Sequence, residues 1–169
     1  MRQVVYSIEG NIGSGKTVLL NLLAKRMTNI AVAPEPVADW QQVNQHNLLQ
    51  QYYSDPQRWA YTFQNYAILT RSKHLHQLLQ TEYPAGCLLF SERSIGADRE
   101  IFAKLLHRQK KMTDMEHSLY VKFYDDLSSL YKLPPVHRHI YLRTDPQRCQ
   151  ERIRLRNRAE EQSIPLDYL

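Results

Sequence analysis

A run of residues with the spacing of a phosphate-binding loop lies near the start of the sequence. It reads Gly-Asn-Ile-Gly-Ser-Gly-Lys-Thr and fits the pattern G-x-x-x-x-G-K followed by Ser or Thr. Glycines allow successive backbone N–H groups to turn toward a phosphate, while Lys16 can reach the β and γ oxygens and Thr17 can ligate Mg²⁺. The pattern predicts a site for ATP or GTP formed by Gly10, Asn11, Ile12, Gly13, Ser14, Gly15, Lys16 and Thr17.

Two acidic residues and an arginine follow later apolar runs of the chain. Glu35 stands between two prolines after the run 30–33, and Glu92 and Arg93 end the run 87–91. Because the carboxyl ends of parallel strands meet at one edge of a sheet, we expect all three side chains beside the phosphates. The competing interpretations are a surface or capping glutamate at position 35 and a structural salt bridge between Glu92 and Arg93.

Strand-like and helix-like segments alternate along the chain, with the phosphate loop between the first pair. Near-continuous apolar runs are typical of buried parallel strands, and apolar residues at helical spacing separate them. The alternation predicts an α/β fold, a doubly wound parallel sheet with helices on both faces, in a single domain over 1–169. We expect strands at about 3–8, 30–33, 87–91 and 139–142, and further helices at about 57–79, 95–106, 115–131 and 146–156.

The composition is that of an ordinary globular protein. Its 169 residues are 43% hydrophobic and 23% charged, and no apolar run approaches the length of a membrane span. The first strand starts too early to leave room for a leader peptide, so we expect a cytoplasmic protein with no membrane partner. Cys87 and Cys149 lack the spacing of a metal site and are expected to be buried thiols.

Arginine is concentrated in one segment near the end of the chain. Between positions 137 and 158 there are seven arginines against two acidic residues, a local charge equal to the whole formal net charge of +5. A short arginine-dense segment suits one triphosphate better than the extended backbone of a nucleic acid, although a solvated helix face is the alternative. Arg152 and Arg156 share one helical face, and Arg158 lies where the helix should give way to a lid.

The ordered set of motifs resembles the deoxyribonucleoside kinase family, in register from Val4 to Leu169. The resemblance implies a P-loop kinase fold and ATP- and Mg²⁺-dependent phosphorylation of the 5′-hydroxyl of a deoxynucleoside. The residues that carry it, besides the phosphate loop, are Pro34-Glu35-Pro36-Val37, Trp40, Trp59, Phe63-Gln64, Ser91-Glu92-Arg93-Ser94, Arg152 through Arg158, Glu160-Glu161-Gln162 and Pro165-Leu166.

The same resemblance implies roles for the catalytic residues. Glu35 corresponds to the base that accepts the proton of the 5′-hydroxyl, Arg93 to the arginine that holds it, and Glu92 to an acid of the Mg²⁺ shell. Clamping of ATP is implied for Lys16 and for the lid, about 152–164, through Arg152, Arg156 and Arg158.

The resemblance also implies a nucleoside pocket. Tyr53 and Glu161 correspond to the pair that binds the sugar 3′-hydroxyl, and Trp40, Phe63 and Gln64 to the wall around the base, whereas Trp59 and Tyr66 are expected in the core.

Three residues of the predicted helix 57–79 share one face toward this pocket: Gln64, Ala67 and Arg71. In the family an aspartate at the position of Asp98 pairs with the arginine, which implies that deoxycytidine or a purine deoxynucleoside is preferred over thymidine. The alternative is an Arg71 that reaches solvent and an Asp98 that caps a helix.

The family chain continues beyond this one with a helix and a last strand, which we expect to be absent here through truncation or because the protein is naturally short. Dimerisation through the helices 57–79 and 115–131 is implied. A thymidine or nucleoside monophosphate kinase and an inactive nucleotide-binding relative are the alternatives. The carboxylate of Glu35 would repel the phosphate of a monophosphate acceptor, which argues against a monophosphate kinase. Every catalytic candidate is present, which argues against an inactive relative. The two observations favour the active nucleoside kinase.

Overall fold

The computed structural model describes residues 4–169, and the chain contacts divide it into two compact units. The first unit holds the described residues up to Glu35, together with Gln77–Ser94 and Pro134–Leu169. The second unit holds Pro36–His76 and Ile95–Leu133.

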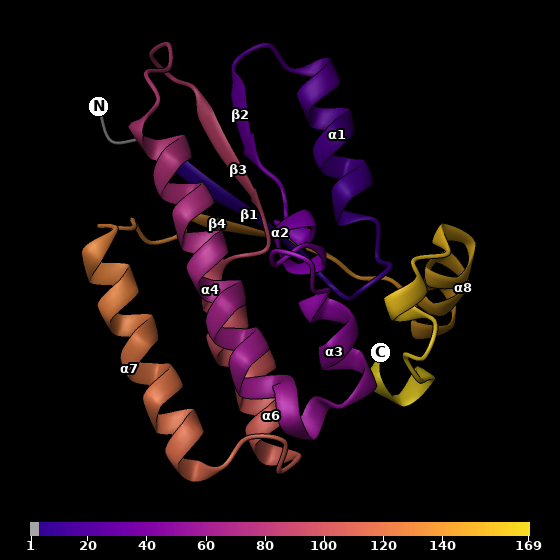
Figure 1. Ribbon diagram of the computed structural model, residues 1–169. Helices are drawn as coiled ribbons and strands as arrows, with labels where there is room; N and C mark the ends of the chain where they lie inside the picture. The colour runs from indigo at the N-terminus through magenta and orange to yellow at the C-terminus, as the bar shows by residue number, and fades with distance from the viewer. Residues whose placement is uncertain (1–3) are drawn as a thin grey trace. The chain divides into compact units, whose positions relative to one another are not determined.

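The first unit is built on a four-stranded sheet (Figure 1). The strands are β1 (Val4–Gly10), β2 (Ile30–Ala33), β3 (Leu88–Glu92) and β4 (Arg138–Leu142), in the order β2-β3-β1-β4. All of the pairings are parallel, which confirms the predicted doubly wound parallel sheet. The predicted start of the first strand, at Gln3, lies outside the described residues.

Apolar side chains cover both faces of this sheet. Helix α1 (Lys16–Arg26) packs Leu20 against Ile8 and Phe90 on one face. Alternate residues of the strands point to the other face, as the period of two requires. There the buried side chains of Val5, Ala31, Cys87 and Leu89 pack with Leu78 and Leu79.

Strand β4 is the edge of the described sheet, because it pairs with β1 alone. We expected a buried strand here, and that was wrong: Arg138 and His139 are exposed, and Tyr141 is 68% exposed. A short apolar run predicts a strand but does not show whether that strand lies in the middle or at the edge of the sheet, because both kinds pack apolar side chains against the core. Helix α8 (Pro146–Arg156) follows, with Asp145 accepting from the N–H of Gln147 as its N-cap.

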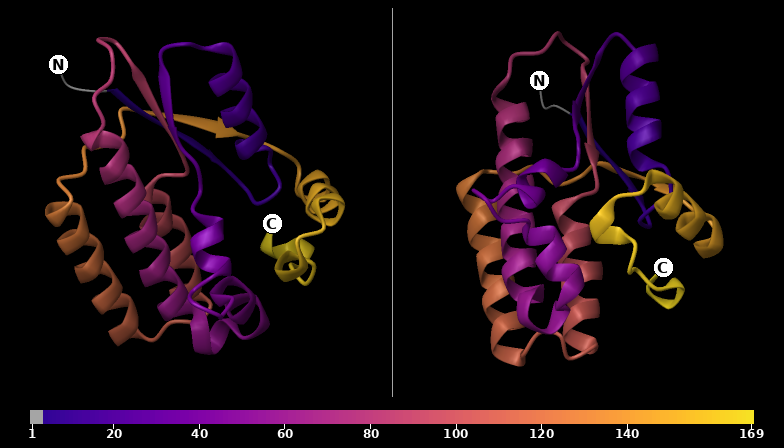
Figure 2. Two further views of the ribbon diagram at one scale, coloured as in Figure 1. Left: turned by 45° about the horizontal axis from the view of Figure 1, so that its top comes forward. Right: turned by 45° about the vertical axis from the view of Figure 1, so that its right-hand side comes forward.

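The second unit is helical, and Figures 1 and 2 show its two long helices, α4 and α7, side by side. Both were predicted, whereas the five-residue α2 and the seven-residue α3 were not. Helices this short complete fewer than two turns, so they leave little periodic signal. The elements are α2 (Val37–Gln41), α3 (Leu48–Ser54), α4 (Pro56–Gln80, whose last turn belongs to the first unit), α5 (Ile95–Ala97), η1 (Asp98–Ala103), α6 (Lys104–Arg108) and α7 (Asp114–Leu130).

The predicted helix 95–106 is present but is not a uniform α-helix. Its middle, η1, is a π-helical turn between α5 and α6. Such turns are rare, cost regular hydrogen bonding and occur often at functional sites. The turn begins at Asp98, the residue expected to pair with Arg71.

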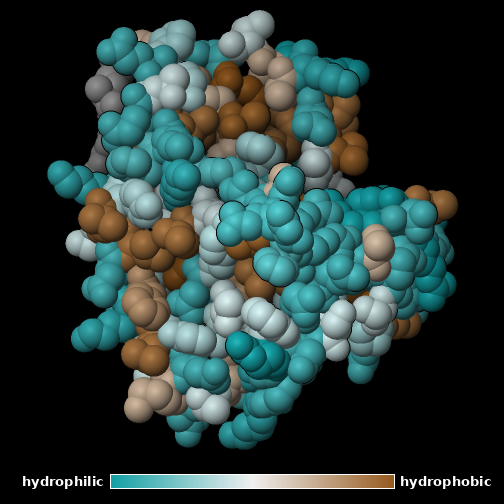
Figure 3. Space-filling view, viewed as in Figure 1, coloured by the Kyte–Doolittle hydropathy of each residue, from teal (hydrophilic) through white to brown (hydrophobic). Residues whose placement is uncertain are grey.

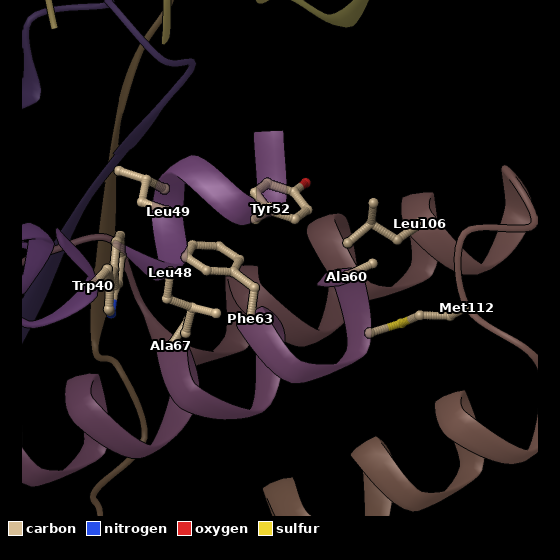
Figure 4. Close-up of a cluster of buried hydrophobic side chains, with 9 residues drawn as sticks. All are labelled: Trp40, Leu48, Leu49, Tyr52, Ala60, Phe63, Ala67, Leu106 and Met112. Atoms are coloured by element: carbon tan, nitrogen blue, oxygen red, sulfur yellow. The ribbon is translucent and has the colours of Figure 1, made fainter. Parts of the chain in front are cut away.

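Aromatic packing forms the main core of the second unit, drawn in Figure 4. The ring of Tyr52 stacks on that of Phe63 with centroids 4.5 Å apart, and Trp40 meets Phe63 edge-on at 5.3 Å. A second cluster joins Ile68 of α4, Ala103 of η1 and Tyr120 of α7. Within residues 4–169, no helix has both the length and the hydrophobicity that a membrane span needs.

Candidate active site

The phosphate loop joins β1 to α1 as its sequence predicts. The loop turns at Gly13 and Gly15, whose φ angles of 77° and 102° are conformations that favour glycine. A Cβ atom on Gly13 would lie 2.4 Å from the carbonyl oxygen of Cys149, so α8 packs against the loop only because this residue is glycine. Lys16 is buried at the start of α1, and its Nζ donates to the carbonyl of Asn11 at 2.9 Å.

Two features of the loop fit a bound phosphate and its cation. The hydroxyl of Ser14 is buried and makes no hydrogen bond within the described residues, as expected of an atom with an external partner. The Thr17 hydroxyl donates to Oε1 of Glu92 at 2.7 Å. Residues 4–169 contain no cluster of three or more His, Cys, Asp or Glu that could hold a metal. Magnesium does not need such a cluster, because it is commonly held by few protein oxygens together with water and phosphate oxygens. The oxygens of Thr17 and Glu92 fit that requirement.

Arg93 connects Glu35 to the phosphate loop. Its Nε lies 3.5 Å from Oε1 of Glu35, and its Nη2 donates to the carbonyl of Gly10 at 3.2 Å. The backbone of Arg93 has a φ of 67°, which is uncommon for a residue with a side chain and marks the turn after β3 as a special conformation. The expected neighbours Glu35 and Arg93 are therefore in contact, beside the first residue of the loop.

Glu9 was missed by the sequence analysis, although it shapes this turn. Its Oε1 accepts from the backbone N–H of Ser94 at 2.9 Å, directly after Arg93. The side chain is only 12% exposed and its Oε1 lies 3.8 Å from Nδ1 of His139. A charged residue within an otherwise apolar strand, next to the phosphate loop, was the available signal.

The arginine-rich segment divides its contacts between two places. Nη1 of Arg152 donates to the carbonyl of Ser14 at 2.9 Å, which brings α8 against the phosphate loop. Arg156 and Arg158 bind the carboxylate of Glu161 instead. The expectation that Arg152 and Arg156 share a helical face holds, but in this structure only Arg152 contacts the loop backbone, and Arg156 contacts Glu161. Figure 3 shows hydrophilic side chains over α8 and the segment after it.

A buried ion pair lies on the predicted base-reading face of α4. Gln64, Ala67 and Arg71 are all buried, and Nε of Arg71 lies 2.8 Å from Oδ2 of Asp98. The alternative of an Arg71 directed to solvent is wrong, because its side chain is 7% exposed. Oε1 of Gln64 is buried and makes no hydrogen bond within the described part of the chain.

Of the aromatic residues assigned to the nucleoside pocket, Trp40 lies beside this pair, and Tyr53 and Phe63 pack in the cluster that contains Trp40. Nε1 of Trp40 donates to the Thr70 hydroxyl at 2.9 Å, and the Arg71 guanidinium lies 5.4 Å from the Trp40 ring centroid. Tyr53 packs half-buried against the same cluster as Phe63. Trp59 and Tyr66 also pack against this cluster, as expected of core residues. Tyr53 belongs to the second unit and Glu161 to the first.

One buried group in each unit has a raised pKa. Burial raises the pKa of the Tyr120 hydroxyl, the charge of Asp98 raises it further, and Arg71 opposes both. Burial likewise raises the pKa of the Cys149 thiol beside the phosphate loop, with Arg152 opposing. Both cysteines are free and buried, so the expectation of packing residues is confirmed.

A family profile described as deoxynucleoside kinase matches residues 6–169. The chain belongs to the deoxynucleoside kinase family. It is 38% identical to the deoxycytidine kinase of Mus musculus, over 96% of this chain and 70% of that relative. It is 34% identical to the mitochondrial deoxyguanosine kinase of Xenopus laevis, over 96% of this chain and 68% of that relative. The resemblance found in the sequence is confirmed, and the chain is a deoxynucleoside kinase, a phosphotransferase with a nucleotide phosphate donor.

Proposed function

We propose that this kinase transfers the γ-phosphoryl group of ATP to the 5′-hydroxyl of a deoxynucleoside, with Glu35 as the base. The observation that carries the proposal is the chain of contacts from Glu35 through Arg93 to Gly10 of the phosphate loop. A carboxylate there is close to where a transferring phosphoryl group would be bound, and the arginine fixes its orientation.

The reaction balances with the groups of the first unit. The carboxylate of Glu35 takes the proton of the 5′-hydroxyl while the 5′-oxygen forms its bond to the γ-phosphorus. The bond between that phosphorus and the β–γ bridging oxygen breaks, and ADP leaves with the electron pair. Lys16 and Arg152 stabilise the negative charge on the phosphoryl oxygens, which is most of what a protein supplies to this kind of transfer.

Mg²⁺ is the cation that we assign to the donor. Thr17 and Glu92 would hold it, and it would neutralise charge on the phosphate oxygens. The hydrogen bond from the Thr17 hydroxyl to the Glu92 carboxylate already brings two hard oxygen atoms together.

The preferred acceptor is deoxycytidine or a purine deoxynucleoside rather than thymidine. The carboxylate of Asp98, paired with Arg71, can accept a hydrogen bond from an exocyclic amino group, whereas the 5-methyl group of thymine would meet a polar surface. Gln64 adds a buried amide oxygen that needs a hydrogen-bond donor. The names of the relatives, deoxycytidine kinase and deoxyguanosine kinase, agree with this preference.

The protein is further proposed to work as a cytoplasmic homodimer, with both units in one kinase domain and residues 152–164 as a lid. Support for a partner comes from α7, where Met115, Leu119, Phe123 and Leu130 are exposed. Figure 3 shows apolar side chains over this helix. Packing of these side chains against a second copy of the chain would remove their apolar surface from water. No role for nucleic acid or membrane is proposed.

Incubation with γ-labelled ATP tests the assignment of donor and acceptor. The four deoxynucleosides and their 5′-monophosphates are offered one at a time, and the labelled product is identified. We expect label on the 5′-oxygen of deoxycytidine or a purine deoxynucleoside and none on the monophosphates. Preferential labelling of a monophosphate would establish the second candidate, a nucleoside monophosphate kinase, and contradict the proposal.

A further inference from the structure

Two neighbouring N–H groups at the turn after β3 are bonded to two neighbouring residues of β1. The N–H of Arg93 donates to the carbonyl of Ile8 at 3.0 Å, and the N–H of Ser94 donates to Oε1 of Glu9 at 2.9 Å. The first bond joins backbone atoms only, whereas the second depends on a side chain. Glu9 therefore supplies one of the two bonds that tie this turn to β1.

These bonds hold Arg93 in an uncommon backbone conformation. Its φ of 67° lies in the left-handed region, which costs free energy for a residue with a side chain and persists only where the surroundings fix it. Arg93 and Ser94 are each 5% exposed, so water does not readily replace a lost backbone partner there. Loss of the Glu9 carboxylate removes one of the bonds that fix the turn and allows its backbone to relax.

The conformation of the turn decides where the Arg93 side chain lies. Its Nε lies 3.5 Å from Oε1 of Glu35, and its Nη2 donates to the carbonyl of Gly10 at 3.2 Å. A change in the φ of Arg93 redirects its Cβ, and a side chain that is 6% exposed has little room to compensate. The place of the guanidinium beside Glu35 therefore depends on the turn and, through the turn, on Glu9.

We propose that Glu9 is a positioning residue of this kinase, which acts on the reaction through the turn at Arg93 and Ser94. The inference rests on the proposed function, in which Arg93 orients the Glu35 carboxylate that accepts the proton. Loss of the Glu9 bond should slow transfer more than it weakens binding of either substrate, because the orientation of the base matters most when the groups react.

The same carboxylate has a cost for folding. Oε2 of Glu9 is buried and makes no hydrogen bond within residues 4–169, and the side chain as a whole is 12% exposed. A charged oxygen without a donor opposes folding. Glu9→Gln removes the charge but keeps an oxygen that can accept from the Ser94 N–H. This variant therefore separates the hydrogen bond from the charge.

Steady-state kinetics of Glu9 variants test the role in the reaction. Glu9→Ala removes the acceptor, and we expect kcat to fall about tenfold or more while the KM values for ATP and nucleoside change much less. Glu9→Gln should keep kcat within about threefold of wild type. Glu9→Asp, a milder change that withdraws the carboxylate by one methylene, should lower kcat in the same direction as Glu9→Ala. Normal kcat in both Glu9→Ala and Glu9→Asp, or a Glu9→Gln as slow as Glu9→Ala, would overturn the inference.

Glu116→Ala is the matched control. Oε2 of Glu116 also accepts from a backbone N–H, that of Thr113 at 2.8 Å, but at the exposed start of α7 in the second unit. Its loss should lower stability as the loss of a helix cap does, without a change at Arg93. The variant should keep the kcat of wild type. An equal decrease of kcat in Glu116→Ala and Glu9→Ala would show a general effect of stability and overturn the inference.

A double variant shows whether Glu9 acts through Arg93. Glu9→Ala is compared in the wild-type background and in an Arg93→Ala background, with γ-labelled ATP to follow slow turnover. If Glu9 only places the Arg93 side chain, its removal should lower kcat in the first background and have little further effect in the second. The same fold decrease in both backgrounds would overturn the inference.

Hydrogen exchange of the Ser94 amide gives a readout that does not depend on the reaction. In Glu9→Ala we expect this amide to exchange about tenfold faster or more, while the Phe90 amide within β3 is unchanged. If Ser94 responds but kcat does not, the positioning role is wrong and the proposed function stands. If labelled ATP transfers no phosphate to any deoxynucleoside, the proposed function is wrong, and the inference is overturned with it.

Discussion

Nε of Arg71 lies 2.8 Å from Oδ2 of Asp98, with both side chains buried in the second unit. The pair connects α4 to the start of the π-helical turn η1. Buried ion pairs add little net stability, but loss of one member leaves an uncompensated charge. We therefore propose that the pair serves recognition of a polar ligand rather than stability. Arg71 lies one helical turn beyond Ala67, on the face of α4 that contains Gln64.

Removal of this pair is expected to change the base preference. In the double variant Arg71→Met with Asp98→Ala, the charges that disfavour the 5-methyl group of thymine are gone and apolar space replaces them. The ratio of thymidine to deoxycytidine phosphorylation should rise. Competition assays with equal concentrations of the four deoxynucleosides measure it, and thymidine as the best substrate of the unmodified protein would refute the assignment.

Stability measurements on the single variants provide the control for that experiment. Asp98→Ala alone leaves the Arg71 charge buried and should destabilise the fold by about 3–5 kcal/mol. The double variant should be less destabilised than the sum of the two single variants. Denaturant unfolding of all three variants tests this, and strictly additive effects would show that the two side chains do not interact.

The arginines of the proposed lid should act mainly on turnover. Arg152→Ala removes a charge that also holds the carbonyl of Ser14, and Arg156→Ala removes one that bonds to Glu161. Each change should lower kcat on the order of a hundredfold while the KM for the nucleoside changes much less. Steady-state kinetics with varied nucleoside measure both constants. A change confined to the KM of the nucleoside would contradict a role in phosphate stabilisation.

The second unit should lose stability in mild acid because of His117. Its Nε2 is buried and makes no hydrogen bond within residues 4–169, and its ring stacks on that of His107 with centroids 4.4 Å apart. Burial lowers the pKa of His117, and the neighbouring His107, Lys104 and Arg99 lower it further. The unfolded chain therefore takes up the proton first, and this stability is present above about pH 6.5 and lost as the pH falls below it.

Thermal unfolding at pH 7.5 and 5.5 measures this effect. We expect a lower Tm at the acidic pH in wild type and a smaller decrease in His117→Phe, which keeps a ring but does not titrate. His46→Phe is the control, because His46 is exposed. An equal decrease in wild type and His117→Phe would exclude His117 as the cause.

Features set by neighbouring residues were predictable from the sequence. The phosphate loop and the long helices α4, α7 and α8 depend on consecutive residues or helical spacing, and their bounds agree with the prediction to within a few residues. The proximity of Glu35 and Arg93 followed from their places after two parallel strands, whereas the contact of Arg71 with Asp98 followed from the family resemblance. Their catalytic and recognition roles remain predictions.

Features that depend on tertiary structure were not predictable in the same way. The exposure of β4 depends on how many neighbours a strand has. The π-helical turn η1 packs through Ala103 against Tyr120 of α7, a contact that local sequence does not indicate. The bond from Glu9 to the Ser94 N–H joins residues 85 positions apart. The contact of Arg156 with Glu161 depends on the left-handed Asn157, which helical periodicity does not indicate.

The turnover of Glu35→Gln tests the assignment of the catalytic base most directly. Glutamine keeps the size and hydrogen bonding of Glu35 beside Arg93 but cannot accept the proton of the 5′-hydroxyl. We predict that kcat falls on the order of a hundredfold or more while the dissociation constant of ATP stays close to that of wild type. Near-normal turnover in Glu35→Gln, with unchanged ATP binding, would contradict the assignment.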